Sequence, residues 1–88
     1  MSDDENQTRR ELRIFIQDNF LYLHPDVELK DGDELLKLGV IDSLGFVELV
    51  EVVQDRFEIA IADVEITEEN FGSIDGIVTF IRRKRQQA

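Results

Sequence analysis

The sequence predicts an all-α domain, a small four-helix bundle with three main helices and a short third helix. The first observation behind this prediction is that three stretches place apolar residues at the three- and four-residue spacing of an amphipathic helix. The second is that one proline and five glycines are too few for a loop-dominated chain. The length of 88 residues fits one small domain.

The first helix is predicted to begin at Thr8, after a polar, disordered segment at residues 1–7. Thr8 and Glu11 match the capping box, in which each side chain accepts a hydrogen bond from the other residue's backbone N–H. An apolar stripe with one polar member follows and consists of Leu12, Phe15, Ile16, Asn19, Phe20 and Leu23. His24 and Pro25 should end this helix, because proline restrains the preceding residue from helical geometry.

A long connection is expected over residues 24–42. The sequence Asp31-Gly32-Asp33 marks a turn, and a short helical turn is expected around residues 33–38. Apolar residues that can anchor the connection over the core are Leu35, Leu36, Leu38 and Val40. A loop of this length in so small a domain is usually functional.

The second helix is predicted over residues 43–57, and its helical wheel has two apolar groups. The core face holds Phe46, Leu49, Val50, Val53 and Phe57. The acidic residues fall on a roughly opposite arc and are Glu48, Glu51, Asp55 and Glu58. Leu44 and Val47 lie among these acids, so the pattern predicts a small exposed apolar group surrounded by carboxylates.

The remainder of the chain predicts a linker and a last helix. The linker, residues 59–72, contains Ile59, Ile61, Val64 and Ile66 and one capped turn at residues 67–70. Ser73 should cap the last helix, whose inward stripe is Ile74, Ile77, Val78 and Ile81. Basic residues 82–85 suit the negative end of that helix dipole. The predicted domain therefore spans residues 8–85, with a C-terminal tail at 86–88.

Charge gives a strong compositional signal, with a formal net value of −10. Residues 26–75 carry fifteen acids and three bases, whereas residues 82–85 are all basic. Nucleic-acid binding is not expected, because it depends on neutralising phosphates with basic residues. An anionic lipid surface would also repel the chain. We expect fast association with basic protein surfaces instead.

Other counts narrow the class of protein further. No cysteine is present, which excludes disulfides and thiolate metal sites, and a single histidine excludes a multi-histidine site. Apolar runs are far shorter than the roughly 20 residues that cross a bilayer. The first residues are acidic, unlike a secretory signal. We expect a cytoplasmic monomer with no metal site and no membrane insertion.

The stretch from Gly39 to Leu44 carries the candidate chemistry. It places Ser43 at the start of a helix, where a hydroxyl is exposed and the free amides and helix dipole favour a phosphate. Asp42 beside it is suited to hold a cation or orient an incoming group. Taken alone, a serine at this position is the commonest helix cap.

The wider pattern resembles a known family. Asp42-Ser43-Leu44 opens a helix with an acidic, partly apolar exposed face, and Phe57-Glu58-Ile59 and residues 71–77 look like the second half of the same fold. Over about residues 8–82 the chain resembles the acyl and peptidyl carrier proteins of fatty acid, polyketide and nonribosomal peptide synthesis.

This resemblance implies that Ser43 receives 4'-phosphopantetheine from coenzyme A, installed by a phosphopantetheinyl transferase that needs Mg²⁺. Asp42 matches the aspartate that helps to place the magnesium and the transferase, and Leu44 matches a leucine that contacts partner enzymes. Val47 would add apolar contact. The acidic residues that would pair with basic docking patches on loading ligases and synthases are Glu48, Glu51 and Asp55.

The chain itself would not be an enzyme, because the thiol of the arm would hold the acyl or aminoacyl group as a thioester. Val40-Ile41 is bulkier than in many fatty acid carriers, and Gly45 stands where a polar helix former is common. Residues 39–50 look closer to nonribosomal and D-alanyl carriers. The alternatives are therefore an acyl carrier, a D-alanyl or peptidyl carrier and, from another class, an acidic adaptor that is never modified.

Cargo shielding also has two interpretations. The side chains of Phe46, Val50, Ile77 and Ile81 either open into a cleft for a chain or form a packed core. A packed core is expected for a short cargo.

Overall fold

The computed structural model describes residues 2–21 and 26–87. Within these residues the chain forms four α-helices and no strand. The elements are α1 (Ser2–Asn19), α2 (Ser43–Phe57), the 3₁₀ turn η2 (Asp63–Glu65), the short α3 (Glu68–Phe71) and α4 (Ile74–Gln87). The all-α architecture with a short third helix is thereby confirmed.

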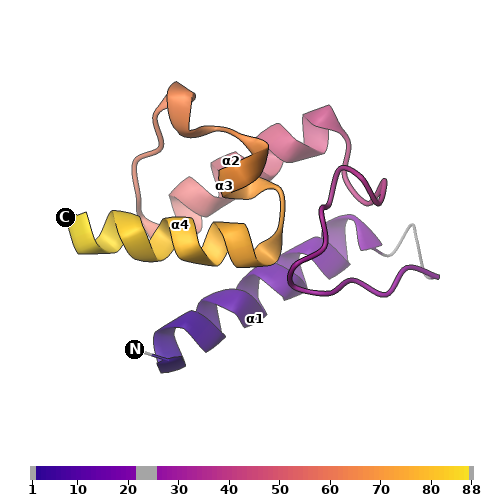
Figure 1. Cartoon of the computed structure of the whole chain (residues 1–88), viewed down its shortest axis with the longest axis horizontal. Coiled ribbons are helices and arrows are strands. Elements are labelled where there is room, and N and C mark those ends of the chain that lie inside the picture. The colour runs from indigo at the N-terminus through magenta and orange to yellow at the C-terminus, as the bar shows by residue number, and fades with distance from the viewer. Residues whose placement is uncertain (1, 22–25, 88) are drawn as a thin grey trace.

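The helices enclose one apolar core. α4 packs against both α1 and α3, and Figure 1 shows α2 running behind α4, with the connection to α2 at the right-hand side. The buried apolar residues are Leu12, Ile16, Leu29, Leu35, Val40, Ile41, Leu49, Val50, Val53, Phe57, Phe71, Ile74, Ile77, Val78, Phe80 and Ile81. The predicted inward stripe of the last helix lies entirely within this set.

The predicted start of the first helix is wrong. α1 begins at Ser2, so residues 2–7 are helical and Thr8 is buried inside the helix instead of capping it. One contact that supports the longer helix comes from the other end of the chain, since Arg82 of α4 donates a hydrogen bond of 2.8 Å to Glu5. α1 ends at Asn19, and the predicted stop at His24 and Pro25 lies outside the described residues.

The caps of the later helices agree with the sequence prediction. The Ser73 hydroxyl accepts a hydrogen bond of 3.0 Å from the Gly76 N–H, and the Thr67 hydroxyl accepts one of 3.2 Å from the Asn70 N–H. α4 continues to Gln87, beyond the predicted end at Arg85.

The basic residues at the end of α4 each contact a different element of the fold. The contacts are Arg82 with Glu5 of α1, Arg83 with Asn70 of α3 at 3.2 Å, Lys84 with Glu65 of η2 at 2.7 Å, and Arg85 over the Phe57 ring of α2 at 5.7 Å. The hydrogen bond from Lys84 is the main reason that the pKa of Glu65 lies below its usual value. The end of α4 therefore joins all the other helical elements.

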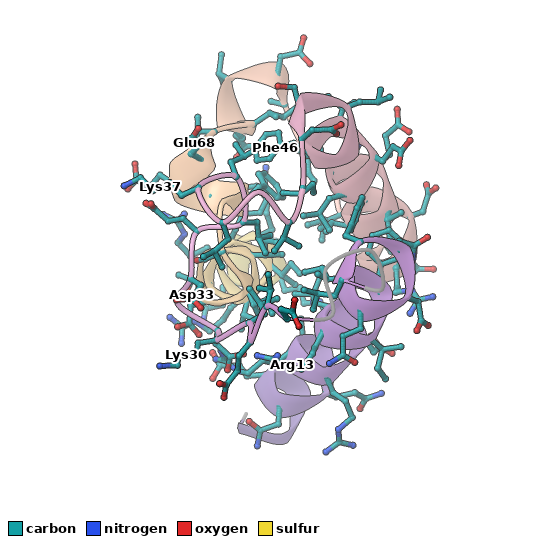
Figure 2. All side chains as sticks on the ribbon, turned by 90° about the vertical axis from the view of Figure 1, so that its right-hand side faces the viewer. Arg13, Lys30, Asp33, Lys37, Phe46 and Glu68 are labelled. Carbon is teal, nitrogen blue, oxygen red and sulfur yellow. The ribbon has the colours of Figure 1, made fainter. Side chains whose placement is uncertain are left out.

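Two arginines of α1 hold the connection before α2. Arg9 forms ion pairs with Asp31 of the connection and with Asp75 of α4, and Arg13 pairs with Asp31 and donates to the Leu29 carbonyl at 2.9 Å. The hydrogen bond to Asp75 is the largest cause of a raised Arg9 pKa. Figure 2 shows Arg13 on α1 beside this connection. We call these four charged residues the arginine clamp.

The connection is also anchored by its apolar residues. Leu35 is buried, and its N–H donates to the Gly72 carbonyl at 2.8 Å. Residues 35–39 form turns, and the Leu38 N–H donates to the Glu34 carbonyl at 3.0 Å, which is a single helical turn within the range expected around residues 33–38. Leu38 is 43% exposed, so it is not the buried anchor that was predicted, whereas Val40 is buried as expected. The connection thus lies against the core directly before α2.

We predict that Arg9→Met removes the arginine clamp's contact with α4 and destabilises the fold. Because the ion pairs are partly open to solvent, the free energy of unfolding should fall by about 1 kcal/mol relative to the control. Arg10→Met is the matched control, since it removes the same charge from an exposed residue of the same helix turn. Urea unfolding at low and high salt measures the difference, which should shrink in high salt. Equal stability of the two variants would refute the clamp.

Candidate functional site

Asp42, and not Ser43, caps the N-terminus of α2. The Asp42 backbone is extended, and its Oδ1 accepts a hydrogen bond of 2.8 Å from the Gly45 N–H. Its carbonyl accepts the first helical hydrogen bond, from the Phe46 N–H at 2.8 Å. Ser43 is therefore the first residue of the helix proper, and the common interpretation of such a serine as the cap does not apply here.

The side chain of Ser43 is exposed at the start of α2. Its hydroxyl has no hydrogen-bond partner among residues 2–21 and 26–87. The first N–H groups of a helix have no intrahelical acceptor, and the helix dipole places partial positive charge there. A phosphate ester on this hydroxyl would therefore lie beside a favourable electrostatic environment.

The residues that lead into Ser43 are fixed by the core. Val40 and Ile41 are each only 3% exposed, which confirms Val40 as a predicted anchor of the loop and adds Ile41 as a second one. Gly39 before them has a φ of +73°, a left-handed backbone conformation that glycine adopts without steric cost. The chain thus turns, buries two aliphatic side chains and emerges with Asp42 and Ser43 at the surface.

The two predicted faces of α2 are both present. Leu49, Val50, Val53 and Phe57 are buried, whereas Phe46 is only half-buried. Leu44 is 69% exposed and Val47 is 50% exposed. Leu44, Val47, Glu48, Glu51 and Asp55 are all exposed, and we call this set the outer face of α2. It begins directly beside Ser43.

Side chains fill the space between α2 and α4, where a cleft for the cargo was one of the two alternatives. Val50, Ile77 and Ile81 are each at most 3% exposed and belong to one packed cluster, with Phe46 partly buried against it. A shallow polar cavity of about 270 Å³ lies elsewhere and is lined by Glu65, Glu69, Asn70, Phe80, Arg83 and Lys84. The burial of Val50, Ile77 and Ile81 in one cluster favours the packed alternative.

Sequence reasoning missed one packing relationship at the site. From the sequence, Gly45 differs only in standing where a polar helix former is common. In the structure it is buried, and the ring of Phe20 and the side chain of Ile41 lie close to it. A glycine three residues after the cap was the sequence feature that could have indicated close packing against this turn. The partner ring comes from the end of α1, and local sequence does not indicate that contact.

Comparison with known proteins decides the family. A family model described as "Phosphopantetheine attachment site" matches residues 19–81. The chain belongs to the phosphopantetheine-binding carrier proteins. A "D-alanyl carrier protein" of Streptococcus uberis (strain ATCC BAA-854 / 0140J) is 34% identical over 62 residues, which cover 70% of this chain and 77% of that protein.

Membership has direct consequences for this carrier. Its cofactor is a covalently attached 4'-phosphopantetheine, and carrier proteins are themselves non-catalytic. The residues present fit such a group, because an exposed serine hydroxyl, without a hydrogen-bond partner among the described residues, stands at a capped helix start. Among the described residues, no helix is long and apolar enough to span a membrane.

We predict that Asp42→Ala lowers the free energy of unfolding of the carrier by about 1 kcal/mol, the usual effect of losing an N-cap. Asp42→Asn is the matched control, since an asparagine oxygen can accept the same hydrogen bond from Gly45. Urea unfolding followed by circular dichroism measures both variants. The cap assignment is wrong if the two variants are equally destabilised.

Proposed function

We propose that Ser43 is the attachment residue of this carrier. In this proposal the Ser43 Oγ bears 4'-phosphopantetheine, whose thiol holds an acyl or aminoacyl group as a thioester. The observation that carries the proposal is the cap. Asp42 binds the Gly45 N–H, so the Ser43 hydroxyl is left exposed and has no hydrogen-bond partner in the part of the chain that the structure describes.

The proposed cargo is small, and an aminoacyl group is the favoured class. Two observations support this choice. The apolar side chains between α2 and α4 are packed in one cluster, in which Val50, Ile77 and Ile81 are buried. The similar Streptococcus uberis protein is a D-alanyl carrier. A peptidyl carrier is the nearest alternative, and a long acyl chain fits less well because packed interiors do not admit it.

The chain's own residues would attach and present the arm. Asp42 holds the first turn of α2 in place through its hydrogen bond to Gly45, and its second carboxylate oxygen is available toward the transferase's Mg²⁺. Ser43 supplies the nucleophilic oxygen. Negative charge on the outer face of α2 would steer basic partner enzymes toward the arm, and Leu44 and Val47 would add apolar contact after docking.

The proposed partners are a phosphopantetheinyl transferase, an acyl- or aminoacyl-loading ligase and synthase enzymes with basic docking patches. We propose that they meet the carrier as a monomer in the cytoplasm. Electrostatics supports docking to basic patches, because Glu48, Glu51 and Asp55 form no ion pair with another described residue. Their charges are therefore available to a partner.

We predict that incubation with coenzyme A, Mg²⁺ and a transferase of broad specificity adds one phosphopantetheine to the protein. Ser43→Ala should abolish this gain in intact mass, because it removes the only proposed acceptor oxygen. Ser73→Ala is the matched control, since Ser73 also stands at a helix start and should be dispensable for labelling. A wild-type protein that stays at its original mass would instead favour the unmodified acidic adaptor.

We predict that reversing charge with Glu48→Lys and Glu51→Lys slows turnover by the partner enzymes about tenfold or more at low salt, through loss of electrostatic steering. The fold should be intact, because both residues are exposed. Asp18→Lys with Glu28→Lys is the control pair, which changes net charge equally at exposed positions outside α2. Steady-state kinetics at low and high salt measure the effect. Equal slowing by both pairs would show that only net charge matters.

A further inference from the structure

Gly45 is enclosed in the first turn of α2. A methyl group added to its Cα would lie 2.8 Å from Ile41 Cγ1, 2.9 Å from Phe20 Cε1 and 3.3 Å from Asp42 Oδ1. The first two separations are shorter than carbon atoms tolerate without movement. Three groups from the end of α1 and from the loop thus converge on the space that a side chain would occupy.

Backbone conformation does not explain this glycine. Gly39 is the only described glycine with a positive φ, so Gly45 has a backbone conformation open to any residue. Glycine inside a helix is less favourable than alanine, because its backbone loses more conformational freedom on folding. What Gly45 provides in return is the close approach of its neighbours.

Phe20 is itself held firmly by α1. Its N–H donates to the Ile16 carbonyl at 2.8 Å, and its ring packs edge-on against Phe15 with centroids 5.9 Å apart. The ring therefore links the end of α1 to the first turn of α2. On the other side of that turn, Asp42 binds the Gly45 N–H. Ser43 lies within the segment that these contacts fix.

We propose that Gly45 and Phe20 are positioning residues for the modification of Ser43, an inference that rests on the proposed function. In that reaction the Ser43 oxygen attacks the β-phosphorus of coenzyme A. A new O–P bond forms, the P–O bond to adenosine 3',5'-bisphosphate breaks, and the serine proton passes to a base of the transferase or to water. The contact between Phe20 and Gly45 keeps the attacking oxygen at a fixed place in the first turn.

The experiment measures the transferase's kcat and KM with the whole carrier as substrate, in the presence of coenzyme A and Mg²⁺. Gly45→Ala should lower kcat about tenfold or more, because small displacements of a reacting atom are costly. KM for the carrier should stay within about twofold, because the outer face of α2 is unchanged. Phe20→Ala should lower kcat about threefold, again with little change in KM.

The two substitutions should also be coupled. In Gly45→Ala with Phe20→Ala the added methyl group occupies space vacated by the ring, so the loss should be smaller than the product of the single losses. Gly76→Ala is the matched control. Gly76 is likewise three residues after a cap, and the atoms nearest to its added methyl group would be the Glu69 carbonyl oxygen at 2.9 Å, Ser73 Oγ at 3.3 Å and the Asn70 carbonyl oxygen at 3.4 Å, none of which belongs to the loop before Ser43. It should leave kcat unchanged even where it lowers thermal stability.

The outcomes separate this inference from the proposed function. A wild-type protein that is labelled, together with a normal kcat for Gly45→Ala or strictly multiplicative losses, overturns the positioning role and leaves Ser43 as the attachment residue. A wild-type protein that is never labelled overturns both. If Gly45→Ala does not fold, Phe20→Ala decides, because an unchanged kcat for that variant overturns the proposal.

Discussion

The hydrogen bond from the Gly45 N–H to the Asp42 carboxylate determines the geometry of the whole site. Aspartate and serine are both good N-caps, and a negative charge gains further from the helix dipole. Because Asp42 takes the capping position, Ser43 becomes the first helical residue and its hydroxyl faces solvent. With the cap moved by one residue, the serine oxygen would be engaged by the backbone.

Basic and acidic residues have different roles in this fold. This chain has ten basic and twenty acidic residues, and many of its cations are used inside the fold. Arg9 and Arg13 hold the connection before α2, while the end of α4 holds α1, η2 and α3. The acids on the outer face of α2 are left without such partners in the described structure. An acidic surface beside Ser43 is the consequence.

Local periodicity was sufficient for much of this structure but not for its long-range contacts. The bounds of α2, its two faces and the cap at Ser73 were predicted because a 3.6-residue repeat and capping chemistry are local properties. The start of α1 was predicted wrongly, and one contact that supports the longer helix joins Glu5 to Arg82, far away in sequence. The packing of Phe20 on Gly45 was missed for the same reason. Cargo identity depends on partner enzymes, which this sequence does not encode.

The most direct test of the account is to locate the arm on the protein purified from its natural source. After proteolysis, fragmentation mass spectrometry of the peptide that contains Ser43 identifies the residue that carries the arm and the group bound to the arm's thiol. We expect phosphopantetheine on Ser43, carrying a small aminoacyl thioester or a free thiol. Phosphopantetheine on a different serine, or a natural protein without any arm, would contradict the account.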